Sequence, residues 1–368
     1  MPAKQTKHRH VFEELRRAIL NGQYQPGEKL PTDSEFSERF RTSRLTVMRA
    51  LRDLQTEGLV KRRAGAGTYV NAERGMAPHV FGLLIPDLGE GEIFEPVCQG
   101  MARTGQSEHQ ALLWGNTSPS ADTKAKQAEE LCRYYIANKV AGVFFAPIEL
   151  IEERAEVNQR IVSMLNAASI PIVLLDRDIY DYPERSQYDL VGLNNYRGGY
   201  RMAAHLLLGG VTRVGFIARL GSAPTVALRM AGYREALWDS DIRPDPSWIA
   251  WGDPSDTKFV RDFLKRARPQ AVLCATDYTA GLFMQSLSAL KIEVPGEIRL
   301  AAFDDVKYAS LLPVPLTTLR QPCFAIGAQA IYTMLDRIAR PDSCARDVLL
   351  DGELVVRESC GVRRDGRE

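Results

Sequence analysis

The chain has 368 residues, of which 45% are hydrophobic and 25% charged, a composition typical of a soluble protein with two or three domains. No run approaches the roughly 18 apolar residues of a membrane span, and the N-terminus has no apolar stretch of signal-peptide length, so we expect a cytoplasmic protein without a membrane partner. The six cysteines form no CxxC pair and have no histidine at zinc-ligand spacing. We therefore expect core thiols, no bound metal and no cofactor.

The net charge of +1 is unevenly distributed along the chain. Residues 1–78 carry 15 Lys and Arg against 9 Asp and Glu, a net charge of +6, which leaves 32 basic and 37 acidic residues, a net charge of −5, for the remainder. A solvated surface can carry such an imbalance. A basic N-terminal unit joined to a larger acidic one also fits a head that binds a polyanion.

The N-terminal unit predicts three helices and a hairpin. A first helix is expected at about 8–20. Thr32 and Glu35 have the spacing of a capping box, which predicts a short helix at 33–40. A third helix follows at 43–58 after a two-residue turn, and two helices joined this closely form a helix-turn-helix. Strands at 59–63 and 68–70, with a glycine-rich turn between them, predict a basic wing.

The helix at 43–58 has both ends marked, by Ser43 as N-cap and by Gly58 as the closing residue. Its apolar stripe comprises Val47, Ala50, Leu51 and Leu54. The other side is polar and basic, and carries Arg44, Thr46, Met48, Arg49, Arg52 and Gln55. Alone, that side fits a solvated surface as well as a DNA groove. The elements around it favour DNA.

About 60 residues of this unit share a motif with a known family. The motif runs from Leu20-x-Gly22 and Pro26-Gly27-x-x-Leu30-Pro31 through Ser43-Arg44-x-Thr46-Val47 to Gly65-x-Gly67-Thr68-Tyr69-Val70. It resembles the winged helix-turn-helix of GntR-type bacterial regulators. The resemblance implies that Arg44 reads base edges, that Thr46 contacts a base or phosphate, and that the wing tip lies over the minor groove. The DNA-binding residues it implies are Thr32, Ser43, Arg44, Leu45, Thr46, Met48, Arg49, Arg62, Arg63, Gly65, Ala66 and Gly67.

Two positions depart from the family pattern. Met48 stands where many relatives have a base-reading arginine, so we expect a different operator half-site. Arg41 replaces the usual turn glycine, which predicts either a strained turn or an added phosphate contact.

Residues 1–70 are thus expected to form the DNA-binding domain, residues 71–78 a linker, and residues 79–368 a second domain. In the second domain continuous apolar runs, typical of buried parallel strands, alternate with helical patterns. The predicted strands are 81–85, 111–114, 142–145, 172–175, 214–217, 271–273 and 300–303. The predicted helices are 95–109, 122–138, 152–168, 196–209, 225–238, 256–267 and 277–290. The alternation alone allows one large sheet or two lobes.

A second resemblance covers nearly all of residues 79–360. Asp176-Arg177, Val191-Gly192-Leu193-Asn194-Asn195-x-x-Gly198-Gly199, Arg229-x-x-Gly232-Tyr233 and Phe303-Asp304-Asp305 follow the order of the LacI/GalR regulators. This implies an α/β fold of the type I periplasmic-binding-protein kind, with two doubly wound parallel sheets flanking a cleft. The implied lobes are about 79–190 with 318–344, and about 191–317 with 345–360.

Ligands of such lobes bind beyond the carboxyl ends of strands, and Asp176, Asp277 and Asp304 each follow a predicted strand. Carboxylates paired with a guanidinium suit sugar hydroxyls. The resemblance assigns Asp176, Arg229, Thr276 and Asp304 to the effector pocket. Phe94 or Trp251 would supply an apolar wall, although aromatics also serve as core. For Asp277 and Asp305, helix capping or structural hydrogen bonding explains the residue equally well.

A GntR-type head on a LacI/GalR-type body resembles the arabinose-repressor type of regulator. We therefore expect a homodimeric repressor of carbohydrate-utilisation genes that binds double-stranded operator DNA and a small polar effector, by analogy a sugar. A nucleobase effector, an activator, and more remotely a solute-binding receptor are the alternatives. The sequence has no phosphate loop, GxSxG, HExxH or GxGxxG motif, so we expect no catalytic residues and no enzyme.

Overall fold

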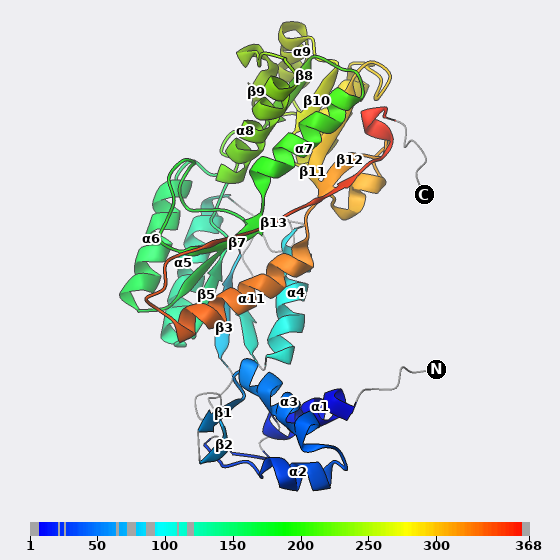
Figure 1. Cartoon of the computed structure of the whole chain (residues 1–368). Coiled ribbons are helices and arrows are strands. Elements are labelled where there is room, and N and C mark those ends of the chain that lie inside the picture. Colours follow the sequence, from blue (N-terminus) through cyan, green and yellow to red (C-terminus); the bar gives the residue numbers. More distant parts are fainter. Residues whose placement is uncertain are drawn as a thin grey trace. The chain divides into compact units, whose positions relative to one another are not determined.

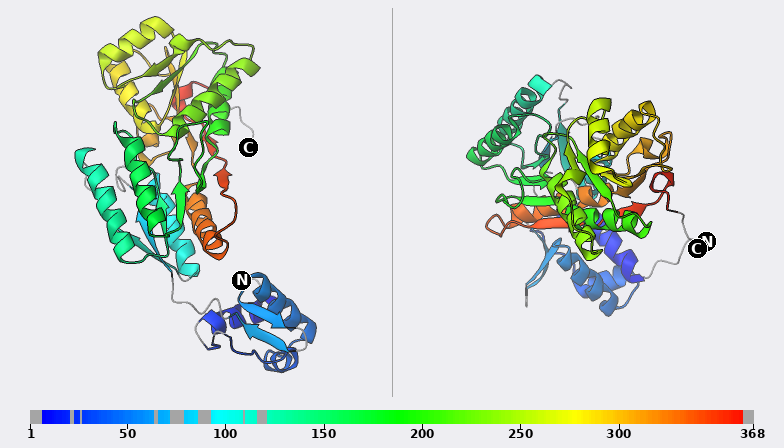
Figure 2. Two further views of the ribbon diagram at one scale, coloured as in Figure 1. Left: turned by 90° about the vertical axis from the view of Figure 1, so that its left-hand side faces the viewer. Right: turned by 90° about the horizontal axis from the view of Figure 1, so that it is seen from above.

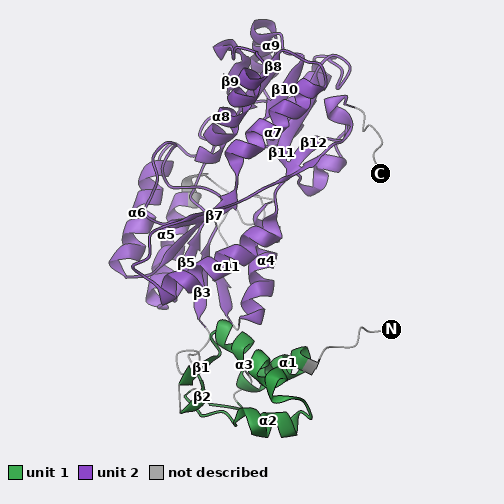
Figure 3. Ribbon diagram, in the orientation of Figure 1, with its two compact units in different colours: residues 1–78 green, residues 79–368 purple. Residues whose placement is uncertain are grey.

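The computed structural model describes residues 7–20, 23–25, 27–63, 66–71, 79–85, 93–108, 110–115 and 121–362. Contacts within the chain divide it into two units, residues 1–78 and 79–368 (Figure 3). Gly65 and residues 72–78, which make up most of the expected linker, lie outside the described residues.

The first unit is a winged helix-turn-helix. It contains α1 (Lys7–Leu20), α2 (Asp33–Arg39), α3 (Arg44–Thr56) and the antiparallel strands β1 (Val60–Arg63) and β2 (Gly67–Val70) (Figure 1). The predicted apolar stripe of α3 is buried in a single core. The buried residues of that core include Val11, Leu15, Phe36, Val47, Ala50, Leu51, Leu54, Leu59 and Val70.

The second unit is built on two six-stranded sheets, and the expected two-lobed α/β fold is confirmed (Figures 1 and 2). The sheet of lobe 1 has the order β13 (Asp347–Leu350), β7 (Asp189–Leu193), β6 (Ile172–Leu175), β5 (Gly142–Phe145), β3 (Val80–Leu84), β4 (Ala111–Trp114). The sheet of lobe 2 has the order β14 (Glu353–Val355), β12 (Thr317–Arg320), β11 (Arg299–Asp304), β10 (Ala271–Cys274), β8 (Val214–Ala218), β9 (Ile249–Trp251). The neighbouring strands in both sheets run parallel, apart from the antiparallel pair β12 and β14.

Helices cover both faces of each sheet, because alternate side chains of the strands point to opposite cores. In lobe 1 one core packs α4 (Phe94–Ser107) and α11 (Cys323–Ala339), and the other packs α5 (Ala121–Ala137) and α6 (Arg154–Ala167). In lobe 2 one core packs α7 (Asn195–Leu208) and α8 (Pro224–Asp239), and the other packs α9 (Thr257–Ala267) and α10 (Asp277–Ala289). Short 3-10 turns occur at η2 (Pro246–Trp248), η3 (Lys307–Ser310) and η4 (Glu358–Cys360).

The structure corrects the expected lobe boundaries at about 190, 317 and 344. β7 completes its pairing in lobe 1 before the chain passes to α7, and β12 completes its pairing in lobe 2 before the chain returns to α11. β13 also pairs within lobe 1, so the third crossing lies between β13 and β14. The crossings therefore fall after residues 193, 320 and 350. Each strand must finish its ladder of hydrogen bonds before the chain can leave the sheet.

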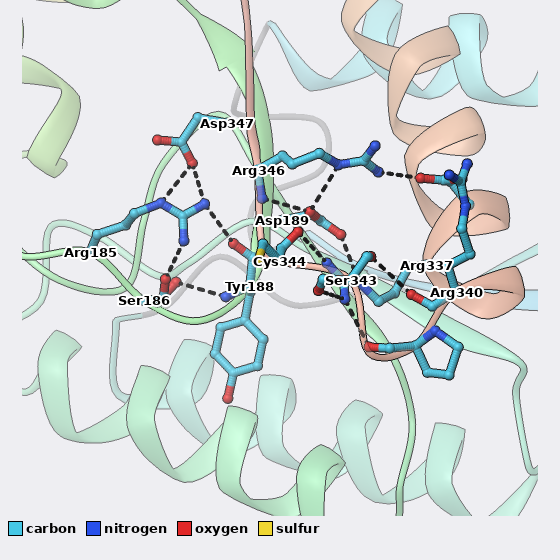
Figure 4. Close-up of polar contacts among 12 residues, drawn as sticks. Arg185, Ser186, Tyr188, Asp189, Arg337, Arg340, Ser343, Cys344, Arg346 and Asp347 are labelled. Carbon is cyan, nitrogen blue, oxygen red and sulfur yellow. Dashed lines mark hydrogen bonds and ion pairs between the residues drawn. The ribbon is translucent and has the colours of Figure 1, made fainter.

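Asp189, at the start of β7, anchors two of these crossing strands within lobe 1 (Figure 4). Its side chain is fully buried and accepts hydrogen bonds from Nε of Arg337 at 2.8 Å and from the backbone N–H of Arg346 at 2.8 Å. The Arg337 guanidinium also donates to the carbonyl oxygens of Pro341 and Ser343. The connection from α11 to β13 is thus fixed to β7 by one satisfied buried carboxylate.

Two kinds of site are absent from the described ranges. No helix in them is long and apolar enough to cross a membrane. No group of three or more His, Cys, Asp or Glu side chains in them is placed to hold a metal ion.

Candidate nucleic-acid interface and effector site

Helix α3 presents an exposed face that is both basic and apolar. Leu45 and Met48 are 58% and 38% exposed, and Arg44 and Arg49 are exposed beside them. Within the described part of the chain, neither arginine makes a hydrogen bond or an ion pair. Their guanidinium groups are therefore available to phosphates or base edges.

The N-terminus of α3 is closed by Ser43 and Thr46. The Ser43 hydroxyl accepts a hydrogen bond from the Thr46 N–H at 3.2 Å, and the two hydroxyls are 2.8 Å apart. This fixes the first turn of α3, where Arg44 lies. The preceding turn residue, Arg41, has a φ of 46°, so a non-glycine residue occupies the left-handed region.

The N-terminus of α2 and the wing are connected. Thr32 forms the predicted capping box with Glu35, whose side chain accepts from the Thr32 N–H at 2.7 Å, and these hydrogen bonds lower the pKa of Glu35. Arg62 of β1 donates to Asp33 at 2.7 Å. The Arg63 guanidinium lies 4.9 Å from the centre of the Tyr69 ring. Arg62 and Arg63 thus have partners inside the head, unlike Arg44 and Arg49.

At the wing tip, the described residues are Ala66 and Gly67, both exposed, while Gly65 is not described. The Ala66 N–H donates to the Arg63 carbonyl at 3.0 Å and closes the turn. Gly67 has a φ of 113°, a conformation that L side chains rarely adopt, and a Cβ there would meet the Lys29 side chain.

The second site is an ionic cluster contributed by both lobes. Asp176 follows β6, Asp304 ends β11 and Arg229 lies on α8. Asp176 and Arg229 are only 8% and 3% exposed. Burial raises the pKa of Asp304, the Arg229 guanidinium opposes that rise, and the charge of Asp176 adds to it.

Arg229 is held in place on four sides. Its Nε donates to Oδ1 of Asn195 at 2.8 Å and its Nη1 to the Ala275 carbonyl at 2.6 Å. Its Nη2 lies 3.5 Å from Oδ1 of Asp304, and the guanidinium packs over the Phe303 ring at 4.6 Å. These contacts leave part of the forked donor group unused and pre-orient it.

Glu149, Arg177 and Phe94 extend the cluster in lobe 1. Arg177 pairs closely with Glu149, lies 3.7 Å from Asp176 and packs over the Phe94 ring at 5.6 Å. Oδ1 of Asp176 is buried and accepts no hydrogen bond from the described residues. A buried acceptor without a donor is costly, so this oxygen is suited to a ligand that brings an O–H or N–H group.

Burial raises the pKa of both aspartates, since it penalises the charged form. Against this, Arg177 and Arg229 favour the charged form of Asp176, and Arg229 and Gln321 favour that of Asp304, whose pKa still rises to about 6. Burial also opposes the charge of Glu149, but Arg177, the Ala223 N–H and Arg229 together lower its pKa.

The remaining predicted effector residues lie in different surroundings. The Thr276 hydroxyl caps α10 by accepting from the Thr279 N–H at 3.1 Å, beside the Ala275 carbonyl that holds Arg229. Trp251 is 39% exposed at the end of edge strand β9. Among the described residues, it makes no hydrogen bond or ring contact with the cluster.

Asp277 and Asp305 take structural roles. Asp277 is fully buried and accepts from the Thr318 hydroxyl at 2.6 Å and from the Val306 N–H at 3.0 Å. Asp305 forms ion pairs with Arg320 and Arg357 at 2.7 and 2.6 Å. Both side chains thus make the structural hydrogen bonds that the sequence allowed for them.

Sequence reasoning missed Glu149, Asn195 and Gln321 as members of the cluster. Glu149 follows β5 by four residues, so the rule that ligands bind beyond carboxyl ends of strands would have found it. A surface cavity of about 670 Å³ lies elsewhere, and none of the predicted effector residues lines it. Its lining residues are Pro295, Val355, Val356, Arg357, Glu358, Gly361 and Val362.

The fold and the exposed recognition helix define a DNA-binding transcriptional regulator with a two-lobed body. Residues 7–70 match the family model of the bacterial regulatory proteins of the gntR family, and residues 203–360 match that of the periplasmic binding protein-like domain. The chain thus combines a GntR-type head with a periplasmic-binding-protein-like body, as the two resemblances implied.

One relative is similar over nearly the whole chain, and another over about half of it. The arabinose metabolism transcriptional repressor of Geobacillus stearothermophilus is 26% identical over 96% of this chain and 97% of its own length. The ribose operon repressor of Haemophilus influenzae is 28% identical over 52% of this chain and 58% of its own length. A solved complex of the transcriptional regulator CelR with cellobiose shares the fold, with a TM-score of 0.65 and 20% identity over 97% of this chain and 100% of its own.

Proposed function

We propose that this regulator is a homodimeric repressor of carbohydrate-utilisation genes, controlled by a sugar bound at the cluster of Asp176, Arg229 and Asp304. The observation that carries this proposal is the buried cluster of hydrogen-bonding charges at the carboxyl ends of strands from two lobes. The relatives named for arabinose metabolism and for the ribose operon support it. A protein that acts on operator DNA works in the cytoplasm.

The charges of the cluster favour a neutral ligand with several hydroxyl groups. Glu149, Asp176 and Asp304 outnumber the guanidinium groups of Arg177 and Arg229, so a phosphorylated or carboxylate ligand would meet net repulsion. A sugar hydroxyl could donate to the open Oδ1 of Asp176, while its oxygens accept from the unused N–H groups of Arg229. Phe94, Thr276 and Trp251 are proposed as further contacts at the edge of the site.

At the operator, each head of the dimer would read one half-site with α3 in the major groove. Arg44 and Thr46 are proposed to contact bases or phosphates at the start of the helix. The other proposed contacts are Thr32, Ser43, Leu45, Met48, Arg49, Arg62, Arg63, Gly65, Ala66 and Gly67. Effector binding would favour one arrangement of the two lobes and thereby change how the heads are held.

Two substitutions test the assignment of roles. Arg44→Ala should abolish operator binding in a fluorescence anisotropy titration and leave effector binding intact. Arg229→Ala should keep operator binding and remove the response to effector. If Arg229→Ala instead lost operator affinity and melted early, Arg229 would be a structural residue.

A thermal-shift screen tests the ligand class. We expect arabinose, ribose or cellobiose to stabilise residues 79–368, because a ligand at about 100 times its dissociation constant adds about 2.7 kcal/mol. Stabilisation by nucleobases and by no sugar would replace the sugar with the nucleobase alternative. We propose that the protein acts by binding alone, and turnover of a bound sugar by the pure protein would contradict this.

A further inference from the structure

Two consecutive residues after β5 reach from lobe 1 to the loop that precedes α8 in lobe 2. The Glu149 carboxylate accepts a hydrogen bond from the Ala223 N–H at 2.8 Å, and the Leu150 N–H donates to the Gly221 carbonyl at 2.9 Å. Leu150 has a φ of 62° and Gly221 a φ of 73°. A Cβ on Gly221 would lie 3.4 Å from Cα of Leu150, so the two loops are in tight contact.

Glu149 completes a helix that has no side-chain cap of its own. Ala223 is the N-cap residue of α8, and its side chain cannot accept a hydrogen bond. The Glu149 carboxylate bonds to the N–H of this residue, as the glutamate of a capping box does, but from the other lobe. A negative charge there is also favoured by the positive end of the helix dipole.

The same carboxylate is tied to the effector cluster. It pairs with Arg177, which neighbours Asp176 in lobe 1, and α8 carries Arg229 in lobe 2. Glu149 therefore connects Arg177 and Asp176 of lobe 1 to α8 of lobe 2, the helix that carries Arg229.

A second contact between the lobes is weaker. Lys307 of η3 pairs with Glu95 of α4 at 2.8 Å, but the two side chains are 85% and 54% exposed. An ion pair in water contributes little.

Because Asp176 and Arg229 are almost fully buried, a ligand reaches them only when the lobes separate or the side chains move.

We propose that Glu149 is a positioning residue whose bond to Ala223 exists only in the closed arrangement of the lobes, and that it raises effector affinity by stabilising closure without touching the effector. The Arg177 pair lies within lobe 1 and survives opening, whereas the Ala223 bond does not. The part of this proposal that concerns affinity rests on the proposed effector site.

The first experiment needs no ligand. Hydrogen–deuterium exchange of the full chain compares wild type with Glu149→Ala and with Glu152→Ala, an exposed carboxylate on the same segment. We expect faster exchange in residues 219–226 for Glu149→Ala alone, with the segment at α9 unchanged in all three. Unchanged exchange in residues 219–226 would overturn the proposal, whatever the effector is.

The second experiment breaks the same bond from the other lobe. Ala223 has a φ of −57°, which proline adopts, so Ala223→Pro removes the N–H donor without demanding a new φ. Each single variant should weaken arabinose binding by roughly 10- to 100-fold in calorimetry, the range of a hydrogen bond to a charged group. The double variant should be no weaker than either single one. Additive losses would overturn the proposal, because they would show that the two residues act independently.

The two experiments separate this proposal from the sugar effector. If wild type binds none of arabinose, ribose and cellobiose while Glu149→Ala still speeds exchange in residues 219–226, the sugar assignment fails and the closure contact stands. If the sugar binds wild type and Glu149→Ala equally, the sugar assignment stands and the role of Glu149 fails.

Discussion

Arg41 occupies the turn between α2 and α3 with a φ of 46°, where a glycine would fit without a steric penalty. For a residue with a Cβ the left-handed region costs roughly 1–2 kcal/mol. A glycine avoids this cost but loses more conformational entropy on folding, which offsets part of the gain. The strained turn expected from the sequence is therefore present. Its exposed guanidinium lies next to the start of α3, and the sequence allowed an added phosphate contact there.

Arg41→Gly should stabilise the head by about 0.5–1 kcal/mol, because removing the left-handed strain outweighs the extra conformational entropy that a glycine loses on folding. Thermal unfolding followed by circular dichroism measures this change. If Arg41 also contacts a phosphate, operator affinity falls while stability rises. A variant that is less stable than wild type would show that the turn is not strained.

Asp304 has a pKa raised by burial from 3.8 to about 6. Its folded pKa exceeds its unfolded one, so ionisation of Asp304 lowers the free energy of unfolding. This loss grows as the pH rises from about 4 to about 6, is complete above about pH 6, and is absent below about pH 4. Asp304→Asn should therefore raise the free energy of unfolding at pH 7.5 by on the order of 2 kcal/mol, and by less at pH 5. Urea unfolding at the two pH values measures both.

Asp305→Asn is the matched control for Asp304→Asn. Its carboxylate pairs with Arg320 and Arg357 at 2.7 and 2.6 Å and is almost fully buried, so its neutralisation should destabilise the protein. Equal effects of the two substitutions would mean that the environments of these adjacent carboxylates do not differ as described.

At the scale of elements, pairs of glycines set how closely the helices pack. A Cβ on Gly199 of α7 would overlap the Arg229 carbonyl of α8, and one on Gly232 of α8 would overlap the Tyr196 carbonyl of α7. In lobe 1, Gly100 of α4 and Gly327 of α11 approach the partner helix in the same reciprocal way. The glycines of the LacI/GalR-type motif thus place α8, and with it Arg229.

Gly199→Ala should destabilise the protein by about 3 kcal/mol, because two helix backbones must move apart. Gly281→Ala in α10 is the control, since its Cβ would meet only the Leu312 side chain at 3.7 Å. There alanine should be neutral or stabilising by up to about 1 kcal/mol. Thermal unfolding of both variants measures the difference, and similar melting temperatures would contradict the packing argument.

At the scale of the whole molecule, the basic head and the acidic body are separate compact units with separate charges. The head has free arginines on α3, whereas Arg62 and Arg63 are held within it. The affinity of two such heads for the operator should come mainly from contacts to DNA phosphates. Arg62 can contact a phosphate only if it weakens or breaks its ion pair with Asp33.

The logarithm of operator affinity should fall with the logarithm of salt concentration, with a slope of roughly −0.9 for each phosphate neutralised. Anisotropy titrations between about 50 and 200 mM salt measure the slope. Arg49→Ala should make it shallower by about 2 in a dimer, one phosphate for each head. A flat response would contradict DNA binding through these residues.

Local patterns in the sequence determined much of this protein. The caps at Thr32 and Ser43, the stripe of α3 and the seven apolar runs predicted elements that the structure contains, because caps and periodicity act between residues a few positions apart. The two family motifs then predicted both modules and the cluster of Asp176, Arg229 and Asp304.

Only the tertiary structure decided the strands that cross between the lobes and the contacts of Glu149. β7 begins with Asp189 and β12 with Thr317 and Thr318, all buried polar residues, so neither strand appears as a continuous apolar run. Such groups are buried only where a partner satisfies them, and the partner of Asp189 lies 148 residues away. Likewise, Glu149 meets Ala223 across 74 residues. No local pattern contains that information, because folding brings the partners together.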